Sequence, residues 1–140
     1  MLSPEEIDDL LPQTGDMRQI QRVPFLSPDP QRGIGIKEVG NEEFWVPGHI
    51  PGRPLLPGVM MIEAAAQVSS ILYQVYHGKR DFIGFTRCEE CSFRGQVIPG
   101  DTLIVLALER RFQRRRFICQ TQGYVKGELV FEALITGMTM

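Results

Sequence analysis

His49 and Glu63, fourteen positions apart, are the side chains of this sequence best suited to acid–base chemistry. The imidazole of an unperturbed histidine has a pKa near 6.5, which suits a general base at neutral pH. Glu63 lies among apolar residues, and burial raises the pKa of a carboxyl group, which suits a group that must supply a proton. Because a buried charge is costly unless it is paired or protonated, we favour a functional role over a chance contact with solvent or an arginine.

A helix that begins at Pro57-Gly58 can add hydrogen-bond donors between this base and this acid. The free N–H groups of a first helical turn, with the positive end of the helix dipole, can polarise a carbonyl oxygen. Glycine at position 58 allows a ligand to approach the backbone closely, although the motif taken alone is also that of an ordinary proline-started helix. Gln67 lies one turn after Glu63 on the same face, where it can orient Glu63 or a bound water.

Two elements must hold these residues in place. Four prolines and two glycines lie within the eleven residues 47–57. This composition predicts a stiff loop around His49, because each proline fixes its own φ and restricts the preceding residue. Residues 57–77 then predict one long helix whose apolar side chains cover nearly its whole circumference, so the helix should be buried. Gly78 is a typical residue for the end of such a helix.

The remaining residues predict a short N-terminal helix over about 3–11, opened by a capping box of Ser3 and Glu6, and a series of strands. Short turns between the later strands are typical of an antiparallel meander. In residues 33–36 glycine alternates with isoleucine, so another element can pack closely against the glycine face. Together these elements predict a single α+β domain over residues 1–140, with a sheet wrapped around the long helix. The expected strands are 17–26, 34–39, 82–93, 102–111, 117–125 and 128–139.

The composition argues against several classes of protein. The net charge is -2, whereas proteins that bind nucleic acids are usually basic. No apolar run is long enough to predict a membrane span, and the acidic N-terminus is unlike a secretory signal. Three cysteines, an odd and low number, indicate a reducing cytoplasm rather than a disulfide framework.

Cys88 and Cys91 have the spacing of a C-x-x-C motif, but no second pair of metal ligands accompanies them. In a regular strand, residues three apart point to opposite faces of the sheet. We therefore expect neither a zinc site nor a redox site at these cysteines.

A set of short motifs, in a consistent order and spacing, resembles the 3-hydroxyacyl-[acyl carrier protein] dehydratases. These are hot-dog-fold enzymes of fatty-acid synthesis, in which an antiparallel sheet wraps around one buried central helix. The resemblance covers roughly residues 32–135. The motifs that carry it are Lys37-x-Val39, Glu43, Gly48-His49-Ile50-Pro51-Gly52-Arg53-Pro54, Pro57-Gly58-Val59, Glu63-Ala64-x-Ala66-Gln67, Phe93, Val97-x-Pro99-Gly100-Asp101 and Tyr124-Val125-Lys126-Gly127-Glu128.

The resemblance implies a role for each residue of the site. His49 would take the proton from the carbon next to the thioester carbonyl, and Glu63 would help to protonate the departing 3-hydroxyl through water. The N–H groups of Gly58 and Val59 would hold the thioester oxygen. His49 and Glu63 would come from different subunits of a homodimer, either alone or within a trimer of dimers. Glutamate rather than aspartate at position 63 resembles the branch that dehydrates without isomerising the double bond.

The resemblance implies neither a metal nor a redox cofactor, and the phosphopantetheine arm would belong to the acyl carrier protein. The sequence departs from the family in residues 12–20, where members usually have an arginine- and proline-containing stretch that helps to shape the acyl tunnel. The chain-length preference of the family therefore does not transfer to this chain. Ile50 stands where phenylalanine is usual, and Asn41-Glu42 lacks the usual asparagine directly before Glu43.

Two further groups of residues are candidates for binding. An acyl tunnel would be lined by apolar residues that suit a plain core equally well: Ile62, Ala66, Phe82, Ile83 and Phe85. We interpret the basic run 110–116 first as a solvated hairpin tip. The alternative is a docking patch for an acidic carrier protein, where charge mainly raises the association rate. That patch would comprise Arg53, Lys79, Arg110, Arg111, Arg114, Arg115 and Arg116.

The main expectation is a cytoplasmic dehydratase that acts on 3-hydroxyacyl chains of a carrier protein. The first alternative is a hot-dog acyl thioesterase, since that fold often uses a helix carboxylate to direct water at the carbonyl. A thioesterase has no evident need for His49 on a stiff loop. The second alternative is a non-catalytic protein that binds acyl thioesters, and the presence of both His49 and Glu63 argues against it.

Overall fold

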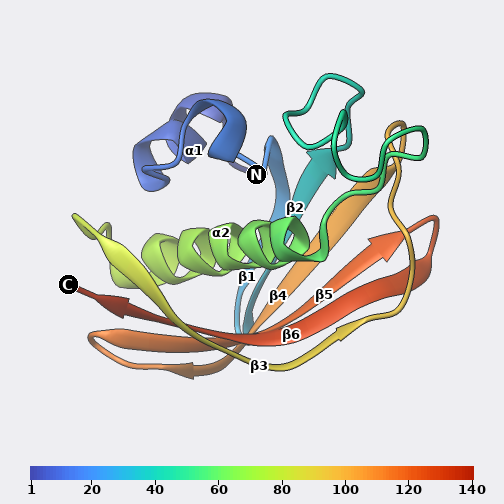
Figure 1. Cartoon of the computed structure of the whole chain (residues 1–140). Coiled ribbons are helices and arrows are strands. Elements are labelled where there is room, and N and C mark those ends of the chain that lie inside the picture. The colour runs from blue at the N-terminus through green and yellow to red at the C-terminus, as the bar shows by residue number, and fades with distance from the viewer.

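The computed structural model describes all 140 residues, and it places one long helix against a curved antiparallel sheet (Figure 1). The long helix is α2 (Gly58–His77), and the short helix α1 (Pro4–Leu10) lies on the side of α2 away from the sheet. The strand order in the sheet is β1-β2-β4-β5-β6-β3. The strands are β1 (Arg22–Pro28), β2 (Gln31–Glu38), β3 (Ile83–Phe93), β4 (Thr102–Phe112), β5 (Arg116–Val125) and β6 (Glu128–Thr139). This arrangement confirms the predicted α+β hot-dog fold.

Close packing of α2 on β2 depends on Gly35 of that strand. A methyl group at Gly35 would lie 2.5 Å from Cγ2 of Val68, and one at Gly33 would lie 3.6 Å from Cδ1 of Leu72. At Gly35 the helix can therefore approach the sheet this closely only because a side chain is missing, as the alternation of glycine and isoleucine predicts, whereas 3.6 Å at Gly33 is an ordinary contact distance. Ile71 and Leu72 are fully buried at the centre of the apolar core.

The N-terminal segment begins as the sequence predicts and then departs from it. The Ser3 hydroxyl accepts a hydrogen bond from the Glu6 N–H, and the Glu6 carboxylate accepts one from the Ser3 N–H, so the capping box is present. The strand predicted over 17–26 is wrong in its first half, because a 3-10 turn (Gly15–Met17) comes first and β1 starts only at Arg22. The physical reason is a side chain of α2, since Gln67 hydrogen-bonds the backbone between Met17 and Ile20.

The edge strand β3 is not the regular strand that was assumed for Cys88 and Cys91. Glu89 pairs with Leu134 and Ser92 pairs with Glu132, so one extra residue is inserted in β3 at a β-bulge. The bulge shifts the alternation by one, and both cysteines then face the side of the sheet that carries α2. Burial and, to a smaller extent, the neighbouring Cys91 raise the pKa of the Cys88 thiol to about 11. The argument that the two side chains point to opposite faces is therefore wrong.

Most other boundaries agree closely with the predicted ones, but β2 begins at Gln31 and not at residue 34. β6 has the predicted limits, and the hairpin before it turns at Lys126 and Gly127, which both have positive φ values of 51° and 78°. The long helix ends where Gly78 adopts a φ of 92°. None of the helices is both long enough and apolar enough to cross a membrane.

Candidate active site

Hydrogen bonds hold His49 at both its backbone and its ring. Its N–H donates to the Trp45 carbonyl over 2.8 Å, and its own carbonyl accepts from the Leu55 N–H over 2.7 Å. Nδ1 of the ring lies 2.8 Å from the Leu55 carbonyl oxygen. Because a carbonyl oxygen can only accept, the neutral ring carries its proton on Nδ1, and Nε2 keeps a free lone pair. The exposed imidazole is thus oriented as a base.

A buried ion pair anchors the loop that carries His49 to strand β2. The Lys37 side chain is only 2% exposed, and its Nζ lies 2.7 Å from Oε1 of Glu43. The same carboxylate accepts hydrogen bonds from Nε1 of Trp45 over 3.2 Å and from the Gly40 N–H over 2.8 Å. Sequence reasoning identified Lys37 and Glu43 only as part of a family motif. The signal for their role is a lysine at an inward-facing position of a strand otherwise packed on the helix.

Glu63 lies half-buried on α2, and Gln67 holds it. Nε2 of Gln67 donates to Oε2 of Glu63 over 3.1 Å. Burial raises the pKa of the Glu63 carboxyl, and the hydrogen bond from Gln67 lowers it by a smaller amount. The net direction is upward, which keeps a proton on Glu63 to a higher pH than on a free glutamate. The expectation that Gln67 orients Glu63 agrees with this geometry.

The start of α2 provides two N–H groups that point away from the helix. Gly58 and Val59 are its first two residues, and an N–H at these positions has no partner within the helix. Pro57 supplies no side-chain cap, and Val59 is 68% exposed. A methyl group at Gly58 would lie 2.7 Å from Cε1 of Phe93, so the glycine also makes room for that ring. The arrangement leaves donors near the surface at the positive end of the helix dipole.

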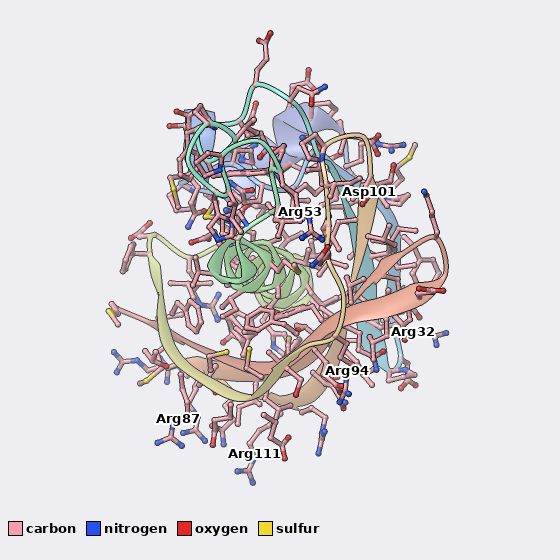
Figure 2. All side chains as sticks on the ribbon, turned by 45° about the vertical axis from the view of Figure 1, so that its right-hand side comes forward. Arg32, Arg53, Arg87, Arg94, Asp101 and Arg111 are labelled. Atoms are coloured by element: carbon pink, nitrogen blue, oxygen red, sulfur yellow. The ribbon has the colours of Figure 1, made fainter.

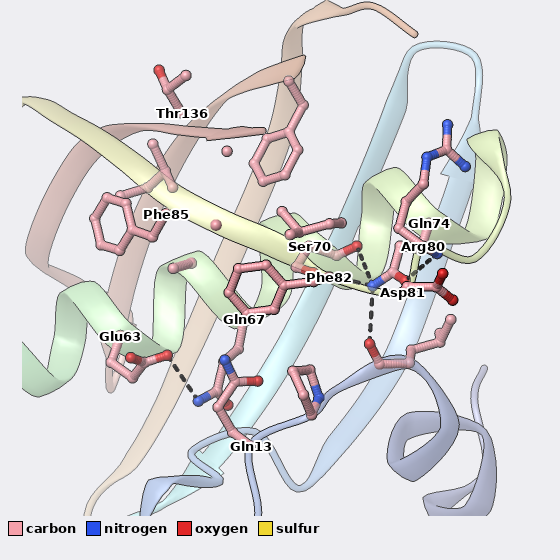
Figure 3. A pocket seen from close by; sticks show the side chains of 18 residues that line it. Gln13, Glu63, Gln67, Ser70, Gln74, Arg80, Asp81, Phe82, Phe85 and Thr136 are labelled. Carbon is pink, nitrogen blue, oxygen red and sulfur yellow. Dashed lines mark hydrogen bonds between the residues drawn. The ribbon is translucent and has the colours of Figure 1, made fainter. Parts of the chain in front are cut away.

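A cavity of about 170 Å³ opens beside Glu63, between α2, the first residues of β3 and the N-terminal segment (Figure 3). Four of the five residues expected for an acyl tunnel line it, and Ile62 does not: the four are Ala66, Phe82, Ile83 and Phe85. Glu63 and Gln67 line it as well, whereas His49 and Gly58 do not. A single chain therefore places the carboxyl group at this cavity without the imidazole.

The N-terminal segment forms one wall of the cavity through Leu10, Pro12 and Gln13. Two glutamines of α2 hold that segment in place. Gln67 accepts from the Gln19 N–H over 2.9 Å and donates to the Met17 carbonyl over 2.7 Å. Two turns later, Nε2 of Gln74 donates to the Leu10 carbonyl over 2.9 Å. Sequence reasoning missed Gln13 and Gln74, because their roles depend on contacts between segments more than fifty residues apart in the chain.

The basic residues proposed for a docking patch do not gather on one face. Arg53 lies on the loop before α2, where its Nη2 donates to Gln96 over 2.9 Å, and Arg111 lies on the far side of the sheet (Figure 2). Lys79 pairs with Asp9 over 2.7 Å on the surface. Arg114 and Arg115 surround a polar hollow together with Arg80, which sequence reasoning did not include.

Comparisons with known proteins agree with the fold and the motifs. A FabA-like domain model matches residues 11–134. The chain is 40% identical over 126 residues to the 3-hydroxyacyl-[acyl-carrier-protein] dehydratase FabZ of Alkaliphilus metalliredigens. This alignment covers 82% of this chain and 84% of that protein. It is 39% identical over 131 residues to the FabZ of Syntrophotalea carbinolica. The second alignment covers 91% of this chain and 88% of that protein.

Among solved structures, a chain of the dehydratase heterocomplex ApeI:P from Xenorhabdus doucetiae superposes with a TM-score of 0.83 at 14% sequence identity. The superposition covers 100% of this chain and 93% of that one, and at this identity it supports the fold alone. The motifs, the fold and the sequence relatives lead to one assignment. The chain belongs to the FabA-like family and, within it, to the group of the FabZ 3-hydroxyacyl-[acyl-carrier-protein] dehydratases.

Proposed function

We propose that this protein removes water from 3-hydroxyacyl chains on an acyl carrier protein and forms trans-2-enoyl thioesters for fatty-acid biosynthesis. One observation carries the proposal: the chain combines an imidazole with a free Nε2 and a half-buried carboxyl group whose pKa is raised. A dehydration needs both a base for a carbon-bound proton and an acid for a departing hydroxide. His49 and Glu63 are suited to these two tasks in opposite protonation states.

In the proposed mechanism, Nε2 of His49 takes the proton from C2 of the substrate. The electron pair of the broken C–H bond forms the C2=C3 double bond, and the C3–O bond breaks. Glu63 gives its proton to the departing hydroxyl, which leaves as water, and the proton on His49 later returns to Glu63 through solvent. The N–H groups of Gly58 and Val59 stabilise the negative charge that develops on the thioester oxygen. The reaction transfers no electrons between the substrate and another molecule, so it needs no redox cofactor.

A second subunit completes the site in this proposal. His49 does not line the cavity of its own chain, and β3 is an edge strand with an unpaired side. Phe85 and Phe93 on that strand are 46% and 51% exposed, and large apolar groups beside an open strand edge suit a surface that a second copy covers. We therefore assign the unit as a homodimer in which the partner's imidazole faces Glu63. A trimer of such dimers is a further possible assembly.

The partner that delivers the substrate would be an acyl carrier protein in the cytoplasm. Such a carrier is acidic by the family resemblance, and the hollow formed by Arg80, Arg114 and Arg115 offers positive charge close to the cavity, because Arg80 lines both. Charge at this position would mainly raise the rate of association.

The direct test is the hydration of a trans-2-enoyl carrier-protein thioester, which is monitored as a loss of the enoyl absorbance. His49→Ala and Glu63→Gln should each lower kcat by at least about a hundredfold. The matched controls are His77→Ala and Glu128→Gln, which replace the same residue types outside the site and should keep activity. Release of free thiol from the same substrates, in place of hydration, would instead identify a thioesterase. Wild-type rates in both site variants would refute the mechanism.

A further inference from the structure

Cys88 and Cys91 face the helix side of the edge strand β3 from neighbouring positions. The five residues 88–92 of β3 stand opposite only the four residues 132–135 of β6. The inserted residue bends the strand at Glu90, which has a φ of 50°. Cys91 therefore lies about two residue spacings from Cys88, or about 6.8 Å along the strand, whereas a regular strand would separate them by about 10 Å.

A disulfide can span this separation. The Cα atoms of bridged cysteines usually lie about 4.4–6.8 Å apart, and both side chains must point the same way. The bulge meets both conditions, at the long end of the range. Burial and then Cys91, through its charge and a side-chain hydrogen bond, raise the pKa of the Cys88 thiol to about 11. The two thiols are therefore neighbours in space as well as in register.

The third cysteine, Cys119, is not a competing partner. It lies on β5 opposite Ile135, and Cys88 lies opposite the same residue on the other side of β6. Two strand spacings, about 9.6 Å, therefore separate Cys119 from Cys88. Cys119 is also fully buried, whereas Cys88 is half-buried and Cys91 is exposed. The pair on β3 thus combines proximity with access from solvent.

We propose that Cys88 and Cys91 form a redox-active dithiol, which a hydroperoxide oxidises to an intramolecular disulfide. Cys91 is the attacking thiol because it is exposed, and Cys88 is the resolving thiol because it lies beside Cys91. The sequence argues against a redox site here only if β3 is regular, and the bulge removes that condition. The inference goes beyond the proposed function, which uses neither cysteine.

The reaction balances with one molecule of hydrogen peroxide. The Cys91 thiolate attacks one peroxide oxygen, so that an S–O bond forms, the O–O bond breaks and hydroxide leaves with the thiol proton as water. The Cys88 sulfur then attacks the sulfur of this sulfenic acid, so that the S–S bond forms, the S–O bond breaks and a second water leaves with the proton of Cys88. The two thiols lose two electrons, and the peroxide is reduced to two waters. A bridge at the long end of the allowed range is strained, so thiol reductants should reverse it readily.

The disulfide also bears on the proposed active site, through Phe93. This residue follows Cys91 by two positions on β3, and its Cε1 lies 2.7 Å from the place of a methyl group on Gly58. The N–H of Gly58 is one of the proposed donors to the thioester oxygen. Closing the bridge draws Cys91 toward Cys88 and shifts the ring of Phe93 relative to the start of α2, so oxidation should lower the hydration rate. Only this last step rests on the proposed function.

The first experiment reads a single tryptic peptide. Cleavage after Arg87 and Arg94 releases residues 88–94, which contain Cys88 and Cys91. The wild type is reduced, freed of reductant, treated with hydrogen peroxide and then with N-ethylmaleimide before digestion. The peptide should carry no maleimide and lack two hydrogens, and dithiothreitol should restore both thiols. Two free thiols, a sulfinic acid on Cys91 beside a free Cys88, or a disulfide between two subunits would overturn the dithiol.

Single variants test the two roles. Cys88→Ser should stop the reaction at the sulfenic acid of Cys91, which dimedone traps, and Cys91→Ser should leave Cys88 as a free thiol. Cys119→Ala is the matched control and should form the disulfide as the wild type does. A dimedone adduct on Cys88 of Cys91→Ser, without one on Cys91 of Cys88→Ser, would overturn the assigned order of attack.

Enoyl hydration tests the effect on the active site. The oxidised wild type should hydrate a trans-2-enoyl thioester at least about tenfold more slowly than the reduced protein, because small displacements of positioned groups are costly in rate. Dithiothreitol should restore the rate, and Cys88→Ser/Cys91→Ser should keep its rate in peroxide. Equal rates of the oxidised and reduced wild type would overturn this effect. If the reduced wild type hydrates no enoyl thioester, the proposed function fails, while the peptide masses still decide the dithiol.

Discussion

Gln67 donates a hydrogen bond from Nε2 to Oε2 of Glu63 over 3.1 Å, while its Oε1 accepts from the backbone N–H of Gln19 over 2.9 Å. One amide therefore connects the proposed acid to the N-terminal segment that forms a wall of its cavity. This connection has consequences for stability as well as for activity.

Gln67→Leu should lower the free energy of unfolding by about 3 kcal/mol. The substitution removes the partners of the Gln19 and Ile20 N–H groups and of the Met17 carbonyl, and each buried group without a partner costs about 1–3 kcal/mol. Urea denaturation followed by circular dichroism measures the change. Gln122→Leu, on the outer face, should shift it by less than about 0.5 kcal/mol. Equal losses in the two variants would contradict a specific role for Gln67.

Glu63→Gln should stabilise the protein increasingly as the pH rises. Burial raises the pKa of Glu63 in the folded state, so the unfolded state releases this proton at a lower pH than the native state does. The stability contributed by the neutral carboxyl is complete below the unfolded pKa, near 4.3, and is lost as the pH rises through the higher folded pKa. Glutamine cannot ionise and keeps that stability.

Thermal melts of both proteins between pH 4 and pH 8 test this expectation. The difference in Tm should be small at the acidic end and should grow toward neutral pH in favour of Glu63→Gln. A difference that is constant across the range would mean that Glu63 has an ordinary pKa in the folded protein.

Two inactive variants should restore activity when their subunits are mixed. If each site combines His49 of one subunit with Glu63 of the other, a heterodimer of His49→Ala and Glu63→Gln contains one intact site and one that lacks both groups. Random exchange makes half of the dimers mixed, so about a quarter of the wild-type activity should return after refolding the two variants together. Mixing without any recovery would indicate that both residues act from one chain.

Glu43→Gln should destabilise the loop around His49 by about 3 kcal/mol. The change leaves the charge of Lys37 buried, with a side chain only 2% exposed, and without its carboxylate. The double variant Lys37→Met/Glu43→Gln should recover part of this loss, because no unpaired charge remains. A double-mutant cycle from denaturation curves measures the coupling. Additive effects of the two single changes would argue against the pair.

The three cysteines should differ strongly in their reactivity. Burial raises the pKa of the Cys119 thiol to about 12, and burial together with Cys91 raises that of Cys88 to about 11. At pH 8 only about a thousandth of Cys88 is thiolate, so the exposed Cys91 should be alkylated first. Mass spectrometry of tryptic peptides after brief treatment with iodoacetamide gives the order. Rapid labelling of Cys119 in the folded protein would show that its burial is not maintained.

Local patterns in the sequence predicted most of the elements. The capping box of Ser3 and Glu6, the stop at Gly78 and the turn at Lys126 depend on residues close together in the chain, so their geometry can be recognised without the fold. The alternation in residues 33–36 also predicted the close approach of the helix, because the absence of side chains has the same effect in any context.

The errors have non-local causes. The strand expected from residue 17 does not form there, because Gln67, nearly fifty residues away, takes the backbone groups that a strand would pair. The bulge at Glu90, a residue with a φ of 50°, turned two cysteines to one face against the simple alternation. Neither contact has a signature within a short window of sequence.

The sequence by itself determined the chemical types and the order of the groups, namely a histidine on a proline-rich loop and a glutamate on an apolar helix. Tertiary structure decided their states. The direction of the Glu63 pKa depends on how much water the surrounding elements exclude, and the free Nε2 of His49 depends on a carbonyl six residues along the loop. The unpaired Oε1 of Gln13 depends on every donor around it, because a missing partner is defined only once all neighbours are in place.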